Sequence, residues 1–403
     1  MKQSICLLLI ILSIPVYGQQ SLSAEQKKTD FLYLHQVLDN NYPYFGVCER
    51  QSGVDWLSKR DEHISRLQRT PTDDAYLAEL EHILSELNCR HIDLSPTRHW
   101  DKFRQTYGGV SQYNPNYTQW VNVLNERAEK TSYWNQLLSG DNFIPASYHE
   151  TPKATRMVNY RDSITPDGRI AIMQIASFDV KHLEADFHRM DEFLNKLEHT
   201  DFLIIDLQGN KGGTTQYWMK CLVNRLIQLP IDFQRNLTIK DGSMNSHFYP
   251  FYTSNGSILK TNPDLPCLPP EYLDGSYLLL KESTLIHPFL PVHFQGSIIL
   301  LVDGNTSSAA DELAVFCKST GWATVAGETT AGGGIGGDPA LIQLPESGVI
   351  VRYPALVGFN PDGSLNMETR TTPNITVEGG NTDERLQKLV LILNNLLLKH
   401  TKP

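Results

Sequence analysis

A serine lies where an apolar stretch changes into a helical pattern, at residues 302–314. Ser308 is expected in the first turn of that helix, where unpaired backbone N–H groups and the helix dipole favour negative charge. An oxyanion formed when Ser308 attacks a carbonyl group would therefore be stabilised at this position. A simpler alternative stays open, because Ser307 or Ser308 could only cap the helix, with Asp311 completing the capping turn.

Two glycine-rich turns also follow apolar stretches, at residues 206–213 and 327–337. Glycine lets backbone N–H groups approach a ligand closely, so the first turn, which contains Gly212 and Gly213, could supply a donor to an oxyanion. It could equally be a tight connection between a strand and a helix. The second turn could form a flexible hairpin or the wall of an active site. Neither turn has the G-x-x-x-x-G-K-[ST] spacing of a phosphate-binding loop.

Three short apolar runs predict the strands that would position these turns, at residues 170–175, 202–207 and 297–302. Nearly continuous branched residues are typical of strands that are buried on both faces. Helical patterns alternate with the runs, at residues 183–197, 216–229 and 309–316. This alternation predicts an α/β core, which we place at residues 166–380.

The segments around this core have different patterns. Residues 19–98 carry apolar side chains at helical spacing and predict a helical N-terminal domain, and a further helix is expected in residues 381–403. Residues 99–165 are rich in Tyr, Trp and Asn, which suggests a loop-heavy connection or an embellishment. Eight prolines within residues 229–294 predict an excursion or lid rather than core.

The N-terminus has the pattern of a signal peptide, at residues 1–18. Lys2 precedes an apolar run of about 12 residues, which is shorter than the roughly 20 residues that cross a bilayer. We therefore expect export to the periplasm or the cell exterior, and no membrane span once the signal is removed. A permanent anchor is the alternative.

Composition and charge argue against several classes of protein. The net charge is −10 and no basic stripe is evident, which argues against a nucleic-acid partner. Beyond the signal peptide, five widely spaced cysteines remain, so at least one thiol is unpaired. No pattern indicates a metal site, and no organic cofactor is expected.

The three turns together resemble the C-terminal processing (tail-specific) serine peptidases, a family that includes the tricorn core protease and interphotoreceptor retinoid-binding protein. Family members carry D-L-R-x-N-x-G-G, S-A-x-E and G-E-x-T-x-G-K-G in this order. Residues 206–213, 308–311 and 327–334 match these motifs, within a resemblance that covers roughly residues 165–380. The resemblance implies a crotonase-like (ClpP-like) β/α spiral core and Ser308 as nucleophile. It also implies an oxyanion hole formed by the N–H of Ala309 and that of Gly212 or Gly213.

One departure from the family concerns the general base. The lysine that acts as general base in tail-specific members corresponds by resemblance to Gly333, which has no side chain. Tricorn-like members instead use a histidine from the N-terminal domain, in a stretch L-x-D-G-H-T that residues 87–92 resemble. His91 is therefore the implied base. Its alternative is a surface or capping histidine.

The same relatives place a glutamate before a G-V-x-P-D-I segment, where it orients the histidine. Glu368 corresponds to it by resemblance, and the alternative is an exposed loop carboxylate. No PDZ insertion is evident between His91 and Arg169. The resemblance implies a serine-type peptidase that hydrolyses peptides or proteins by acyl transfer. The alternative is an inactive relative that binds a peptide or an apolar ligand in the same cleft.

Overall fold

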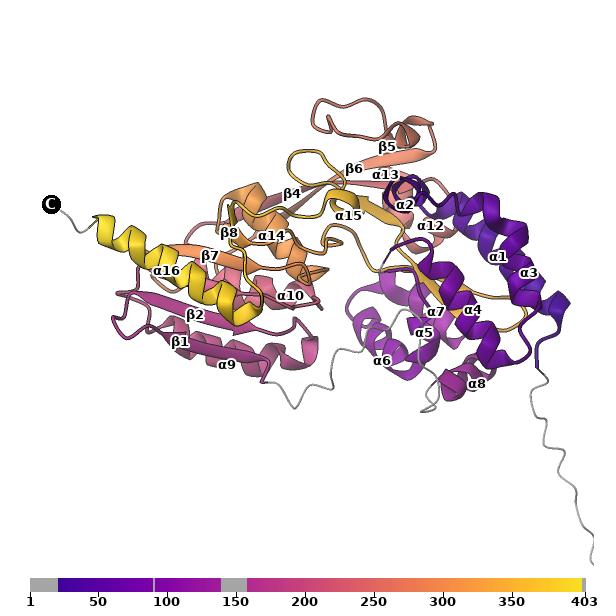
Figure 1. Ribbon diagram of the computed structural model, residues 1–403, viewed down its shortest axis with the longest axis horizontal. Coiled ribbons are helices and arrows are strands. Elements are labelled where there is room, and N and C mark those ends of the chain that lie inside the picture. The colour runs from indigo at the N-terminus through magenta and orange to yellow at the C-terminus, as the bar shows by residue number, and fades with distance from the viewer. Residues whose placement is uncertain (1–20, 90, 139–157, 401–403) are drawn as a thin grey trace, which may run out of the picture.

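The computed structural model describes residues 21–89, 91–138 and 158–400, so the predicted signal peptide lies outside the described residues. Figure 1 shows helices α1–α8 gathered in one lobe and a sheet covered by helices in the other, with strands β4 and β6 extending between them. The protein is thus a mixed α/β fold.

The helical lobe begins with helices whose apolar faces were recognisable in the sequence. Ser23 caps α1 in a reciprocal capping box with Gln26, and α1 ends at Asn41, just before Tyr42 and Pro43. The helices of this lobe are α1 (Ala24–Asn41), α2 (Phe45–Ser52), α3 (Arg60–Gln68), α4 (Asp73–Ser85), α5 (Ser95–Arg98), α6 (Trp100–Ser111), α7 (Thr118–Asn125) and α8 (Ala128–Leu138).

The loop-heavy interpretation of residues 99–165 is wrong for residues 100–138, most of which lie in helices α6–α8. Buried tryptophans, rather than regular aliphatic spacing, hold these helices in place. The indole N–H groups of Trp100, Trp120 and Trp134 donate to backbone carbonyls at 2.7, 2.8 and 2.8 Å. Their side chains share one core with the N-terminal helices. Helices α5–α8 therefore occupy most of residues 95–138, within the stretch between His91 and Arg169 in which no PDZ insertion was evident.

The second lobe is built on a six-stranded sheet in the order β1-β2-β3-β7-β8-β12. Neighbouring strands are parallel except β1 and β2, which are antiparallel. Three of its four inner strands, β2, β3 and β7, are those that the apolar runs predicted. The strands are β1 (Tyr160–Ile164), β2 (Ile170–Ile175), β3 (Phe202–Asp206), β7 (Ser297–Val302), β8 (Thr324–Gly327) and β12 (Ile375–Thr376).

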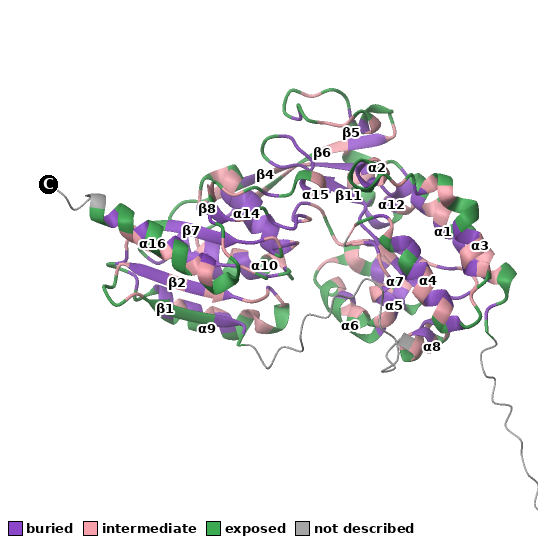
Figure 2. Cartoon of the chain, in the orientation of Figure 1, coloured by how far each residue is buried: buried purple, intermediate pink, exposed green. Residues whose placement is uncertain are grey.

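Helices cover both faces of this sheet, as strands buried on both sides require. Alternate residues of β3 divide accordingly, with Leu203 packed towards the helices on one face and Ile204 packed towards α16 on the other. Figure 2 shows α14 buried and the outer side of α16 exposed. The helices of this lobe are α9 (Leu183–Leu194), α10 (Thr215–Trp218), α11 (Asn224–Leu226), α14 (Ala309–Thr320) and α16 (Thr382–His400).

The prolines of residues 229–294 predicted an excursion or lid rather than core, and this prediction is wrong for strand β4. Strand β4 buries Phe233 and Leu237 in the sheet lobe and Ile239 in the helical lobe, so it belongs to both cores. It lies in an antiparallel sheet of order β11-β4-β6-β5. The remaining elements are β4 (Ile231–Lys240), β5 (Ser257–Ile258), β6 (Tyr277–Ile286), β9 (Ala340–Gln343), β10 (Ile350–Tyr353), β11 (Leu356–Gly358), α12 (Ser243–Phe248), α13 (Pro250–Asn255) and α15 (Asn366–Thr369).

Candidate active site

Ser308 occupies the junction between β7 and α14 in a strained backbone conformation. Its φ is 55° and its ψ is −133°, a combination that side chains rarely adopt and that costs about 1–3 kcal/mol. Its side chain makes no capping hydrogen bond, although Ser308 is the N-cap residue. Helix capping therefore does not account for the Ser308 hydroxyl group, which remains available to act as a nucleophile.

The first glycine-rich turn lies directly against Ser308. A Cβ atom on Gly212 would lie 2.7 Å from Ser308 Cβ and 2.8 Å from the backbone nitrogen of Ala309. The N–H of Gly212 donates to Asn210 Oδ1 at 2.8 Å, so it is already engaged within the turn. Across residues 21–89, 91–138 and 158–400, no hydrogen-bond acceptor is found for the N–H of Gly213 or of Ala309. These two groups are therefore the better candidates for an oxyanion hole.

The second glycine-rich turn forms another wall of the same site. The Gly332 carbonyl accepts the N–H of Ser308 at 3.2 Å. At the next residue, a Cβ atom on Gly333 would lie 3.0 Å from His91 Nε2 and 3.8 Å from Met367 Cε. The structure thus brings His91 to the turn that contacts Ser308. It also shows that a side chain at position 333, where family members carry lysine, would compete with the His91 ring for space.

His91 reaches the site from the helical lobe, on a segment anchored by Asp93. The Asp93 carboxylate accepts two hydrogen bonds from the Arg352 guanidinium, at 2.9 and 2.7 Å, and the two residues also pair through their backbones. Burial would raise the pKa of the Asp93 carboxyl, but the nearby Arg352 charge holds that pKa below its ordinary value. This bidentate pair fixes the chain two residues beyond His91.

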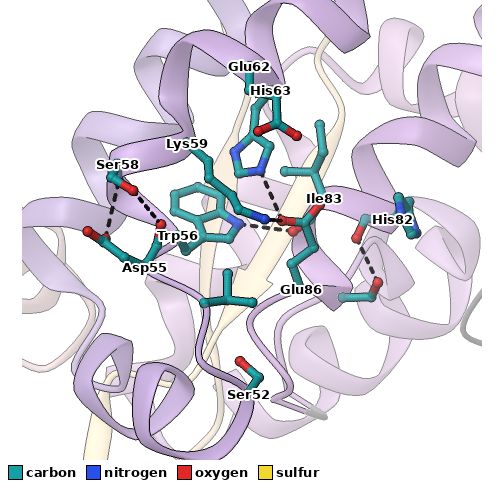
Figure 3. A network of polar contacts seen from close by, with 12 residues as sticks. Ser52, Asp55, Trp56, Ser58, Lys59, Glu62, His63, His82, Ile83 and Glu86 are labelled. Atoms are coloured by element: carbon teal, nitrogen blue, oxygen red, sulfur yellow. Dashed lines mark hydrogen bonds and ion pairs between the residues drawn. The ribbon is translucent and has the colours of Figure 1, made fainter.

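A second anchor precedes His91, at the end of α4. Figure 3 shows the side chains of Lys59 and His63 converging on Glu86, which follows α4. His63 Nε2 lies 3.1 Å from a Glu86 oxygen, and Arg66 contacts the other oxygen at 2.6 Å. Burial lowers the pKa of His63, which favours the neutral imidazole. The chain that carries His91 is therefore held on both sides.

A buried polar network lies beneath the second glycine-rich turn. Asp311 is fully buried in the first turn of α14, and its carboxylate accepts the Thr330 hydroxyl at 2.5 Å and the Gly334 N–H at 3.0 Å. Asn366, at the start of α15, donates to the same carboxylate at 3.0 Å. Burial raises the pKa of the Asp311 carboxyl. No motif or spacing in the sequence marks Asn366, so its place in the site was not predicted.

Glu368 lies in α15 and forms an ion pair with Arg50 of α2. Its two carboxylate oxygens accept hydrogen bonds from Arg50, each at 2.8 Å, and Arg50 also contacts Glu271. The observed partner of Glu368 is therefore an arginine, and its role in orienting His91 stays a prediction. Met367, its neighbour, is the α15 side chain that comes closest to the position of a Gly333 Cβ atom.

The described residues contain no group of three or more His, Cys, Asp and Glu side chains that could hold a metal ion. None of the described helices combines the length and the apolar character that a membrane span requires. Five cysteines are free thiols: Cys48, Cys89, Cys221, Cys267 and Cys317.

Comparison with known proteins identifies the family to which this chain belongs. The family model for Peptidase family S41 matches residues 169–377, more than half of the chain. Similar folds include a candidate peptidase from Parabacteroides merdae (TM-score 0.56, 16% identity, 92% of this chain and 96% of the other). Mature CPAF, alone and with lactacystin, is also similar: both structures give a TM-score of 0.54 and 13% identity over 93% of this chain, and 96% and 97% of the other chain respectively. The TM-scores show a shared fold. The match to the family model, which spans the strands and turns around Ser308, shows that the chain belongs to peptidase family S41.

Proposed function

We propose that this protein is an exported serine peptidase in which Ser308 attacks a peptide carbonyl and His91, rather than a lysine, serves as general base. The contact between His91 and the Gly333 position carries the proposal. Its Nε2 lies 3.0 Å from where a Gly333 side chain would begin, on the turn whose preceding carbonyl binds the Ser308 N–H. His91 therefore lies beside the position from which the lysine of other family members would extend, and in this proposal it replaces that lysine as the general base.

The proposed reaction is acyl transfer to water. His91 takes the proton of the Ser308 hydroxyl as the oxygen attacks, and the N–H groups of Ala309 and Gly213 stabilise the oxyanion. Each such donor contributes about 3–4 kcal/mol to lowering the barrier. His91 then gives its proton to the leaving amine, and a water molecule hydrolyses the acyl-enzyme by the same steps. The substrate is a peptide or protein, and Glu368 is the proposed orienting acid.

A non-catalytic relative that binds a peptide or an apolar ligand at this site is the second candidate. The glycine at position 333 favours it, because the family's usual base is missing. The strained Ser308, whose hydroxyl caps no helix, favours the enzyme, since a binding protein gains nothing from that strain.

A fluorophosphonate probe would distinguish these candidates. The mature protein, beginning near Gln19, is incubated with the probe over a range of pH, and the adduct is located by peptide mass spectrometry. Ser307→Ala and Ser308→Ala are the matched pair of variants. A peptidase is expected to carry the adduct on Ser308 in the unaltered protein and in Ser307→Ala alone. No adduct at any pH, with the fold intact, would overturn the proposed activity.

The orienting role of Glu368 makes a separate prediction. If Glu368 steadies the protonated His91, Glu368→Gln is expected to slow labelling of Ser308 roughly tenfold or more. Arg50→Gln breaks the same ion pair but keeps the carboxylate, so it is the matched control. Equal, small losses of labelling rate in both variants would mean that Glu368 acts only as the ion-pair partner of Arg50. Such a partly exposed pair contributes about 0–1 kcal/mol to stability, so breaking it should have little effect on the rate.

A further inference from the structure

We infer that Asn366 is a positioning residue, whose side-chain amide holds the second glycine-rich turn in the conformation that the Ser308–His91 pair requires. The inference rests on the proposed function, and no motif of the sequence points to this residue. Asn366 contacts the backbone of the turn, so its proposed role is to hold that turn in position relative to Ser308 and His91.

The acceptor end of the amide engages two consecutive glycines. Asn366 Oδ1 accepts the N–H of Gly333 at 2.8 Å and that of Gly334 at 3.1 Å, and Asn366 is only 1% exposed. Gly333 has a φ of 77°, a region that glycine enters as readily as negative φ, so the glycine backbone does not by itself hold the turn in one conformation. The Oδ1 atom satisfies both donors at once, which stabilises this conformation over alternatives.

The donor end of the amide engages the first turn of α14. Asn366 Nδ2 lies 3.0 Å from Asp311 Oδ2, 3.0 Å from Asn360 Oδ1 and 3.2 Å from Thr371 Oγ1. An amide nitrogen has two hydrogens, so these three acceptors share them. Asp311 follows Ser308 by one helical turn. One side chain therefore connects the glycine turn to the helix that starts at the candidate nucleophile.

The turn that Asn366 holds has two contacts with the reacting residues. The Gly332 carbonyl accepts the Ser308 N–H, and Gly333 lies against His91. Without Asn366, the N–H groups of Gly333 and Gly334 would lose a buried acceptor, and the turn could relax. A displacement of about 1 Å between reacting groups can cost about 100-fold in rate.

The first test compares Asn366→Ala with Thr371→Val. The Thr371 hydroxyl accepts from Asn366 in the same buried network, whereas the bonds of Thr371 to Thr330 in the turn involve its backbone, which Thr371→Val retains. We expect both variants to lower Tm, whereas labelling of Ser308 by the fluorophosphonate probe should slow about 100-fold in Asn366→Ala and less than about threefold in Thr371→Val. Similar rates in the two variants would overturn the inference.

Asn366→Asp gives a second test with a pH signature. Aspartate keeps the acceptor for the two glycines, but its carboxyl group would face Asp311, and two such groups can share one proton. We expect the labelling rate of this variant, divided by that of the unaltered protein at the same pH, to be near one at low pH and to fall as pH rises, while the absolute rate of the unaltered protein rises as His91 loses its proton. A loss that does not depend on pH would contradict the inference.

Hydrogen exchange separates this inference from the proposed function. Peptides that cover residues 330–336 are expected to exchange faster in Asn366→Ala than in the unaltered protein, whether or not Ser308 reacts with the probe. If Ser308 fails to label but exchange is accelerated, the proposed peptidase activity fails while the hold on the turn stands. Unchanged exchange would overturn the hold itself.

Discussion

The His91→Ala variant is expected to react with a fluorophosphonate probe at Ser308 about 10²–10⁴ times more slowly than the unaltered protein. The reason is that no lysine is present at position 333 to take the serine proton, and His91 is the ring nitrogen that the structure brings against that position. The measurement is the second-order rate constant of labelling, determined with Tm at each pH.

His99→Ala is the matched control for this prediction. His99 is an exposed histidine just beyond α5, and its removal should change the rate less than twofold. Imidazole added to His91→Ala should restore part of the rate, because the missing ring leaves space beside Gly333. Labelling that is unaffected by the loss of His91 would rule out this residue as the base.

The Gly212→Ala variant is expected to lose both labelling and stability. Its methyl group would lie 2.7 Å from Ser308 Cβ and 2.8 Å from the Ala309 nitrogen and the Ser307 carbonyl oxygen, and two of these atoms are backbone. Relief requires a shift of the start of α14. We expect a loss of roughly 2–5 kcal/mol in unfolding free energy, from steric overlap together with a positive φ, and no detectable labelling.

Gly209→Ala isolates the contribution of the backbone conformation. Gly209 has a φ of 77° in the same turn, but a methyl group there would meet nothing within 4 Å. We expect it to cost about 1–2 kcal/mol and to leave labelling within threefold. Denaturant unfolding and probe labelling of the two variants form the test, and comparable labelling in both would show that the contact between Gly212 and Ser308 is unimportant.

The parts of the fold that the sequence predicted are those with a regular pattern of burial. Strands β2, β3 and β7 were recognisable because both of their faces are covered, which requires nearly continuous apolar residues. The turns near Ser308 were recognisable because close backbone contact requires glycine, as the contact of Gly212 with Ser308 shows. In both cases a local physical constraint leaves a local trace in the sequence.

The parts that were missed depend on partners that are distant in the chain. Helices α6–α8 are held by single tryptophans, such as Trp120, whose indole bonds to the Pro339 carbonyl. Asn366 acquires its importance only through Gly333, Gly334 and Asp311, which lie in two other segments. The pairing of Glu368 with Arg50 joins residues 318 positions apart. Spacing within one segment carries no trace of such contacts.

The order in which the chain is made bears on when the site can exist. Translation delivers His91 early, then the turn at Gly212, then Ser308, and only later Gly333 and Asn366. A nascent chain that already contains the serine therefore lacks the wall behind the histidine, and no truncated product that ends before α15 holds the complete arrangement. The proposed site is therefore completed only after Asn366, in α15, has been synthesised.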